Sequence, residues 1–248
     1  MIQEPIYDID GALFDMGSTL LEYETIPWSV LDVNCMDAAY SFLEKAGYKL
    51  PTADIFWKKH VEIWQKYRNR AAESLEEWSI IDGITDLLAS LDISTDGDMS
   101  DRFFDAYYTP VSRQLTVYAD AHATLEKIKS KGKKIGLVSN TYFPENYHLG
   151  ELKRFGLLPL FDFTIFSVSF GYRKPHRSIY TEAARRLDLE PDRILFVGDR
   201  YVEDCLGPKE SGMNAILKYR EGRDYPDPMD DNQVVVESLT ELLNYIAD

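Results

Sequence analysis

The sequence predicts an α/β protein in which a doubly wound parallel sheet carries an inserted helical domain. From about residue 118 onward, short apolar runs alternate with amphipathic stretches that close at glycine. This alternation is typical of parallel strands covered by helices on both faces. Residues 22–117 differ, because they hold all four tryptophans, place apolar residues at helical spacing and rarely alternate like strands. We therefore expect a core of residues 1–21 and 118–248 and a helical domain of residues 22–117.

The strands and helices of the core are predicted from the spacing of apolar residues and from glycines that end helices. The run 12–14 predicts the first strand, and Gly132, Gly156 and Gly212 mark helix ends. The remaining apolar runs predict strands at 134–139, 161–167, 193–198, 214–218 and 233–236. Between and after them the sequence predicts helices at 121–131, 145–155, 178–187, 203–211 and 239–247.

The inserted segment and one later stretch carry few specific signals. Phe56, Val61 with Trp64, and Tyr67 fit one helical face that we expect to be buried. Residues 92–100 predict a solvated turn, because the glycine and glutamate spacing of a calcium loop is absent. Residues 221–232, rich in Asp and Pro, predict a mobile surface loop.

Composition restricts the partners and the compartment. The net charge of −15 argues against nucleic acid, which needs clustered Lys and Arg. No apolar run has the length of a membrane span, and no signal peptide is visible, so we expect no membrane partner. Cys35 and Cys205 are read as free thiols, which indicates a cytoplasmic protein. The oligomeric state is not readable from the sequence.

Four segments place polar residues after apolar runs. Asp15-Met16-Gly17-Ser18-Thr19 follows the first predicted strand, and Ser139-Asn140 ends the second. A Lys174-Pro175 pair comes before a predicted helix, and Asp199 follows another strand with Asp204 five residues on. Since open α/β sheets bind ligands at the carboxyl ends of their strands, we expect these side chains to converge.

In that order, the four segments resemble the motifs of the haloacid dehalogenase-like hydrolase superfamily, most of whose members are phosphatases. The resemblance implies a Rossmann-type core with a type-one helical cap and Mg²⁺ as cofactor. It implies that Asp15 is the nucleophile and Lys174 its catalytic cation. It further implies phosphate contacts and metal ligands, namely Ser18, Thr19, Ser139, Asn140 and Lys174 for phosphate and Asp15, the Gly17 carbonyl, Asp199 and Asp204 for the metal.

The first motif departs from the family pattern at its third position. The family has a second Asp there, which serves as general acid/base and supplies a carbonyl to Mg²⁺. Gly17 retains the carbonyl but has no side chain to carry a proton. The resemblance therefore leaves four outcomes open: a substrate with a good leaving group, a substitute acid such as Glu22, Tyr23 or Glu24, slow turnover, or binding without catalysis.

A second match to the first motif lies just upstream. Asp8-Ile9-Asp10-Gly11 keeps the second Asp, but only Ile6 and Tyr7 precede it as apolar residues and Ala12 stands at its Thr position. No buried strand leads into it. We therefore favour Asp15 over Asp8 as the nucleophile.

Several roles remain open from the residues alone. Asp204 is a direct metal ligand, a ligand through water, a residue that orients Lys174, or merely a first-turn acid favoured by the helix dipole. Glu203 competes for its role, and Arg173 for that of Lys174. Ser139 and Asn140 are also ordinary turn residues, and the four histidines show no shared metal spacing.

Taken together, the sequence predicts a Mg²⁺-dependent hydrolase, most consistent with a phosphatase of a small phosphorylated metabolite. Two enzymatic alternatives are a 2-haloacid dehalogenase, which needs no metal, and a phosphonatase, which would need a cap lysine. The retained pair Asp199 and Asp204 favours a metal and hence phosphate. A catalytically degenerate phosphate-binding or regulatory protein is the alternative from another class.

Overall fold

The computed structural model describes residues 7–95 and 97–247, which divide into two compact units. Over the described residues, unit 1 comprises residues 7–22, Val117–Thr141 and 145–247. Unit 2 comprises Tyr23–Thr116, apart from residue 96, together with Tyr142–Pro144. Each unit has its own buried apolar residues.

Unit 1 is built on a six-stranded parallel sheet in the order β5-β4-β1-β6-β7-β8. Its central strand β1 places Leu13 beside Gly136 of β4 and Phe196 of β6. The short β2 (Leu21–Glu22) pairs separately with β3 (Thr116–Val117). The sheet strands are β1 (Gly11–Phe14), β4 (Lys134–Ser139), β5 (Phe163–Phe166), β6 (Ile194–Gly198), β7 (Asn214–Lys218) and β8 (Val234–Val236).

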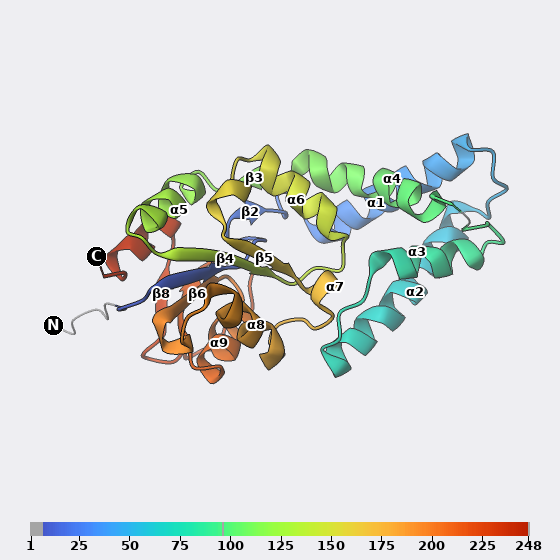
Figure 1. Ribbon diagram of the computed structural model, residues 1–248. Coiled ribbons are helices and arrows are strands. Elements are labelled where there is room, and N and C mark those ends of the chain that lie inside the picture. The colour runs from blue at the N-terminus through green and yellow to red at the C-terminus, as the bar shows by residue number, and fades with distance from the viewer. Residues whose placement is uncertain (1–6, 96, 248) are drawn as a thin grey trace. The chain divides into compact units, whose positions relative to one another are not determined.

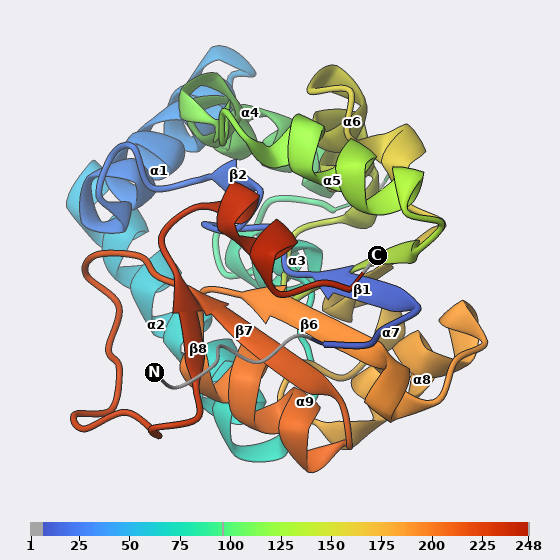
Figure 2. The same cartoon turned by 90° about the vertical axis from the view of Figure 1, so that its left-hand side faces the viewer.

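Helices cover both faces of this sheet, as expected of parallel strands. Figures 1 and 2 show α5 and α6 on one face and α8 and α9 on the other. The α-helices of unit 1 are α5 (Ala121–Ser130), α6 (Glu145–Arg154), α7 (Ser167–Phe170), α8 (Arg177–Leu187) and α9 (Gly207–Glu210). Shorter segments are the 3-10 turns η1 (Leu158–Leu160), η2 (Pro191–Arg193) and η4 (Leu239–Asn244), and the π-helical η3 (Tyr201–Leu206). The predicted doubly wound α/β core is confirmed.

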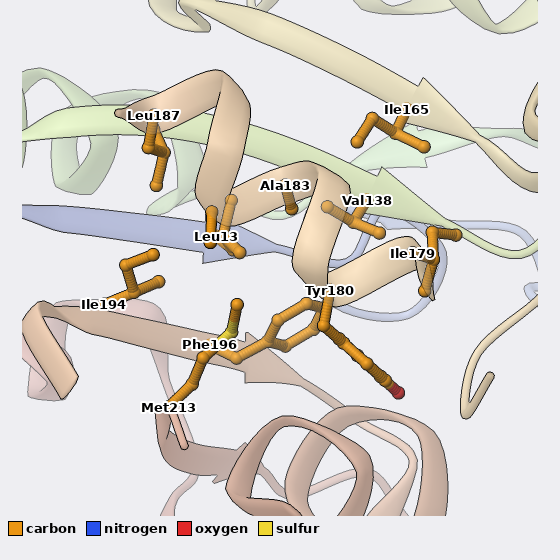
Figure 3. Packing of buried hydrophobic residues seen from close by; sticks show 11 residues of the cluster. Leu13, Val138, Ile165, Ile179, Tyr180, Ala183, Leu187, Ile194, Phe196 and Met213 are labelled. Carbon is orange, nitrogen blue, oxygen red and sulfur yellow. The ribbon is translucent and has the colours of Figure 1, made fainter. Parts of the chain in front are cut away.

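An apolar cluster of unit 1 lies between α8 and the sheet (Figure 3). Tyr180 of α8 meets the ring of Phe196 edge-on, with ring centroids 5.8 Å apart. Leu13 and Val138 pack into the same cluster from β1 and β4. Burial of these side chains fixes the three central strands against one helix, and so fixes the positions of the strand ends.

Two helix predictions in unit 1 were wrong in type. The helix expected at 203–211 is a π-helical turn followed by a short α-helix, because Pro208 has no N–H to donate to the carbonyl four residues back. The helix expected at 239–247 is a 3-10 turn that stops at Asn244. It stops because Tyr7 forms backbone hydrogen bonds with Tyr245 and Ala247, which draw the chain into extended pairing.

Unit 2 contains, among its described residues, the helices α1 (Trp28–Lys45), α2 (Ala53–Ser74), α3 (Ile80–Ala89) and α4 (Met99–Gln114). Helix α1 packs along α4, and α3 contacts both α2 and α4. The expectation that Val61 is buried was wrong, since its side chain is 44% exposed. The buried face of α2 follows the spacing of Phe56, His60 and Trp64, and Val61 lies a further 100° around the helix. Part of the turn expected at 92–100, residue 96, lies outside the described residues.

His60 is an unusual core residue of unit 2. Its ring packs against Trp57 and Trp64, with centroids 5.2 and 4.5 Å away. Neither ring nitrogen has a hydrogen-bond partner among the described residues, and the carboxylate of Asp32 lies 3.8 Å from Nε2. Burial lowers the pKa of His60 from 6.5 to about 4, although Asp32 opposes the shift. The folded protein therefore keeps this imidazole neutral.

We expect this burial to make the fold acid-sensitive between pH 6.5 and about 4. In that window the unfolded chain binds a proton that the folded chain excludes, so the free energy of unfolding falls as pH falls. The difference between 6.5 and about 4 corresponds to about 3 kcal/mol. The variant His60→Phe should lose this component of the pH dependence in urea unfolding measured from pH 7 down to pH 4. A variant whose pH dependence matches that of the wild type would contradict the assignment.

Candidate active site

Three of the predicted site residues lie at the carboxyl ends of adjacent strands. Asp15 follows β1, Ser139 ends β4 and Asp199 follows β6, and β1 lies between the other two. The backbone N–H of Asp15 still donates to the carbonyl of Val197 at 2.9 Å, which continues the strand pairing up to the carboxylate. The parallel register therefore brings these residues to one edge of the sheet.

Lys174 lies between two carboxylates. Its Nζ donates to Asp15 Oδ1 at 2.8 Å and to Asp204 Oδ1 at 2.6 Å, and the side chain is buried. Burial alone would lower the pKa of Lys174, but the neighbouring charges of Asp15 and Asp204 outweigh it and raise the pKa. The site therefore holds a permanent cation against Asp15. Lys174 is therefore not a solvent-exposed surface residue, as most lysines are.

Asp204 has both carboxylate oxygens engaged. Oδ1 accepts from Lys174, and Oδ2 accepts the backbone N–H of Arg200 at 2.9 Å. The side chain lies directly on Gly198, where a Cβ would come within 2.3 Å of Asp204 Cγ, so only glycine fits. Burial raises the pKa of Asp204, and Lys174 acts against this rise. This geometry favours a positioning role toward Lys174.

Asp199 is fully buried, and only one of its two carboxylate oxygens has a hydrogen-bond partner among the described residues. Oδ2 accepts from Arg223 Nε at 2.5 Å, whereas Oδ1 has no hydrogen-bond partner among the described residues. Burial and the charge of Asp15 raise the pKa of Asp199, and the guanidinium of Arg223 opposes them. A buried carboxylate oxygen without a partner is costly. It is therefore a candidate ligand atom.

The carboxylates fit a divalent cation. Within the described residues, ligand atoms from Asp15, Asp199 and Asp204 all lie within 4.8 Å of one another. Hard carboxylate oxygens suit Mg²⁺, which binds one or two carboxylates and keeps several waters. The unpartnered Asp199 Oδ1 is the independent observation that this donor set fits such an ion.

The loop after β1 turns sharply at Gly17 and Ser18. Gly17 forms a bridge with Leu21, and the Ser18 N–H donates to the Leu21 carbonyl at 2.6 Å. Ser18 adopts φ +58°, a left-handed conformation that favours glycine. Its hydroxyl accepts from Arg223, and its carbonyl accepts from Lys218 Nζ at 3.2 Å. Ser18 is thus held by two cations.

The other predicted phosphate contacts lie in different surroundings. Thr19 is buried, and its hydroxyl has no partner among the described residues. Ser139 is buried at the end of β4. The Asn140 amide is used for the lysine segment, since Nδ2 donates to the Lys174 carbonyl at 2.9 Å and Oδ1 accepts the Lys174 N–H at 2.7 Å. Asn140 therefore positions the backbone that carries Lys174.

The segment that follows Asn140 is anchored by buried polar contacts. The Thr141 N–H donates to Ser167 Oγ at 2.8 Å. The Thr141 hydroxyl lies 2.7 Å from His148 Nε2, and His148 Nδ1 lies 3.0 Å from Glu151. These contacts fix the turn at the carboxyl end of β4, where Ser139 lies.

The upstream motif match lies at the opposite end of β1. Asp8 and Asp10 precede the strand and both bind Arg193, with Asp10 Oδ2 2.9 Å from Nε. Their pKa values are lowered chiefly by the hydrogen bonds from Arg193. Asp8 and Asp10 thus form surface ion pairs with Arg193 at the amino end of the strand, away from the carboxyl end where Asp15 lies.

Lys218 at the end of β7 and two residues of the segment that follows it were missed by sequence reasoning. Lys218 is buried, with Nζ 3.8 Å from the centroid of the Tyr118 ring. Arg223 contacts Asp199 and Ser18, and the Tyr225 hydroxyl donates to the Asp199 carbonyl at 3.0 Å. The one signal for Arg223 was a basic residue within the acidic stretch 221–232, which was read as a surface loop.

Glu22, one of the proposed substitute acids, is also engaged. Its two carboxylate oxygens accept from Arg220, at 3.1 Å for Oε1 and 3.3 Å for Oε2, and Oε2 also accepts from the Tyr118 hydroxyl at 2.7 Å. Burial and this hydrogen bond to Glu22 raise the pKa of Tyr118. A carboxylate tied to a guanidinium is a poor general base, because its charge is already neutralised.

Curated proteins of similar sequence include phosphatases. The chain is 32% identical over 132 residues to a glyceraldehyde 3-phosphate phosphatase of Methanothermobacter thermautotrophicus, covering 52% of this chain and 58% of that one. A phosphatase of the same name from Methanopyrus kandleri is 30% identical, over 58% of this chain and 62% of that one. The matches thus span less than two thirds of these relatives. Haloacid dehalogenase-like hydrolase domain-containing protein 3 of Danio rerio is 26% identical over 84% of each chain.

Solved structures share the fold over nearly the whole chain. A 2-haloacid dehalogenase from Pseudomonas syringae pv. Tomato superposes with a TM-score of 0.71 at 21% identity, covering 96% of this chain and 97% of that one. A HAD phosphatase from Thermococcus onnurineus has a TM-score of 0.65 at 26% identity, covering 95% and 97%. The family model for haloacid dehalogenase-like hydrolases matches residues 9–212. The chain therefore belongs to the haloacid dehalogenase-like hydrolases.

Proposed function

We propose that this protein is a Mg²⁺-dependent phosphatase that transfers the phosphoryl group of a small metabolite to Asp15 and then to water. The observation that carries the proposal is the pair of contacts at Lys174, 2.8 Å from Asp15 and 2.6 Å from Asp204, beside the unpartnered Asp199 Oδ1. This arrangement offers a nucleophile, a fixed cation and a metal ligand at one strand edge. Phosphatase-named relatives at about 30% identity support the reaction class.

The proposed reaction assigns a role to each residue. An Asp15 oxygen forms a bond to phosphorus while the bond from phosphorus to the leaving oxygen breaks, which leaves an aspartyl-phosphate. Lys174 stabilises the charge that accumulates on the phosphoryl oxygens, and Asp204 keeps Lys174 in place. Ser139 is proposed to donate its hydroxyl to one phosphoryl oxygen. Mg²⁺, held by Asp15, the Gly17 carbonyl and Asp199, would offset the repulsion between the carboxylates and the phosphate.

The second half-reaction is where Gly17 matters. Hydrolysis of an aspartyl-phosphate is accelerated by a base that removes a proton from the attacking water. Gly17 has no side chain, and the Glu22 carboxylate is bound by Arg220. We therefore propose that phosphoryl transfer to Asp15 outpaces hydrolysis, most of all with substrates whose leaving group needs no protonation, such as acyl phosphates.

The proposed substrate class is supported by the names of the relatives and by the insertion of unit 2 into the core. The curated relatives act, by their names, on glyceraldehyde 3-phosphate, which is a small phosphorylated metabolite. We propose a substrate of that size for this chain. Unit 2, which is inserted between the segments carrying Asp15 and Ser139, is proposed to be the cap that selects it.

The proposal is tested by turnover of acetyl phosphate and para-nitrophenyl phosphate with Mg²⁺ and with EDTA. We expect turnover with Mg²⁺, loss to background in EDTA and recovery when Mg²⁺ is restored, because the clustered carboxylates repel phosphate without a cation. Equal turnover in EDTA would contradict the metal assignment. Phosphate binding without turnover would instead support a binding protein, and chloride release from 2-chloropropionate a dehalogenase.

A further inference from the structure

The segment between β7 and β8 reaches back to the site through Arg223. The guanidinium donates from Nε to Asp199 Oδ2 at 2.5 Å and from Nη2 to Ser18 Oγ at 2.9 Å. It therefore joins the loop after β1 to the loop after β6. The Arg223 side chain is 15% exposed and that of Asp199 only 1%, so the contact lies largely out of solvent.

Contacts on both sides of Arg223 hold the segment in place. Before it, Arg220 pairs with Glu22 at 3.1 Å. After it, the Tyr225 hydroxyl donates to the Asp199 carbonyl and accepts the Arg220 N–H at 3.0 Å. The guanidinium is therefore presented by an anchored turn.

The contact has a consequence for the coordination chemistry of Asp199. Because Oδ2 is bound by Arg223, only Oδ1 remains for an ion, and Oδ1 is buried without a partner. Rotating the carboxylate to offer both oxygens would break a charge-assisted hydrogen bond. Mg²⁺ requires near-octahedral geometry with single carboxylate oxygens, whereas Ca²⁺ takes more ligands and accepts two oxygens of one carboxylate.

We propose that Arg223 is a positioning residue that restricts Asp199 to one-oxygen coordination and thereby makes the site selective for Mg²⁺ over Ca²⁺. The inference rests on the proposed function, in which Asp199 is a metal ligand. Ser18 is the second anchor of the guanidinium. Its hydroxyl gives a reason for a serine at φ +58°, where glycine would be less strained.

The ratio of Mg²⁺ affinity to Ca²⁺ affinity distinguishes the orientation of Asp199 by Arg223 from the effect of the Arg223 charge. The positive charge of Arg223 repels Mg²⁺ and Ca²⁺ alike, so removing it changes both affinities in the same direction. The ratio of the two affinities therefore isolates the orientation of Asp199. Replacement of residues that orient metal ligands changes metal affinity about 10- to 100-fold.

The experiment is isothermal titration of the metal-free protein with Mg²⁺ alone and with Ca²⁺ alone. We expect the wild type to prefer Mg²⁺ and Arg223→Gln to lower the Mg²⁺/Ca²⁺ affinity ratio about tenfold. Arg223→Lys keeps the charge but lacks the planar fork, and should lower the ratio to an intermediate value. Ser18→Ala removes only the second anchor, and provides a milder test should Arg223→Gln fail to fold.

Arg185→Gln is the matched control, since Arg185 pairs with Glu182 on the surface of α8 and its side chain is 70% exposed. It should leave the ratio unchanged. An Arg223→Gln ratio within about twofold of the wild-type value would overturn the inference. If Arg223→Gln does not fold, a Ser18→Ala ratio equal to that of the wild type would do so. Absence of Mg²⁺ binding by the wild type would instead overturn the metal assignment in the proposed function, so the two failures are distinguishable.

Discussion

Asp15→Asn is expected to lower phosphatase turnover by at least about four orders of magnitude, the scale of nucleophile removal in covalent catalysis. The amide keeps the size of the side chain but is a far weaker nucleophile than a carboxylate. The measurement is phosphate release from acetyl phosphate under saturating Mg²⁺. Residual turnover within about tenfold of the wild type would show that Asp15 is not the attacking group.

The fold should survive Asp15→Asn. Asp15, Asp199 and Asp204 repel one another, and the raised pKa values of Asp199 and Asp204 are due first to burial and in part to the charge of Asp15. Removing one charge relieves this repulsion, while Lys174 retains Asp204 at 2.6 Å. We expect a melting temperature equal to or above that of the wild type.

The upstream motif match offers a matched control for this substitution. Asp10→Asn makes the same chemical change at the amino end of β1, where the carboxylate binds Arg193 at 2.9 Å. Its turnover should stay close to that of the wild type. A loss as large as that of Asp15→Asn would place the nucleophile in the upstream motif and reverse the assignment.

Gly17→Asp is expected to raise turnover by about 10²–10⁴ for substrates with poor leaving groups, such as alkyl phosphates. The new carboxyl group would donate a proton to the leaving oxygen and later accept one from the attacking water. For acetyl phosphate only the second step should gain. The measurement is the ratio of turnover with glycerol phosphate to turnover with acetyl phosphate, in the variant and in the wild type.

Gly17→Asn is the control for this gain of function. The amide has the same size but cannot transfer the proton, so its turnover should not rise. An equal rise in both variants would point to a conformational effect of the new side chain. No rise in Gly17→Asp, in a protein that remains folded and binds Mg²⁺, would show that the proton transfers are already supplied by another group.

Hydrophobic period and strand-end chemistry made much of the core predictable. The residues before Asp15 are continuously apolar because β1 is covered on both faces of the sheet, so side chains that point to either face are buried. The same holds for the residues before Ser139 and Asp199. Parallel strands then bring their carboxyl ends to one edge without further information. The α/β core and the family followed from these local patterns.

Contacts made across the fold were not predictable in the same way. Arg223 lies in an irregular segment with no period, and nothing local indicates that its guanidinium reaches Asp199 and Ser18. The role of the Asn140 amide also depends on where the Lys174 backbone passes. The segment at 239–247 was misread because its end is set by pairing with Tyr7 at the other end of the chain.

The central claim is open to direct measurement at Asp15. Because Gly17 has no side chain to act as a base, the account expects slow hydrolysis and therefore accumulation of the phosphorylated enzyme. The protein is mixed with acetyl phosphate and Mg²⁺, quenched in acid, digested and analysed by mass spectrometry. The account predicts one phosphoryl group on the peptide that contains Asp15, removed by hydroxylamine and absent from Asp15→Asn. Continuing turnover with an unmodified Asp15 peptide, or a phosphoryl group on another residue, would contradict it.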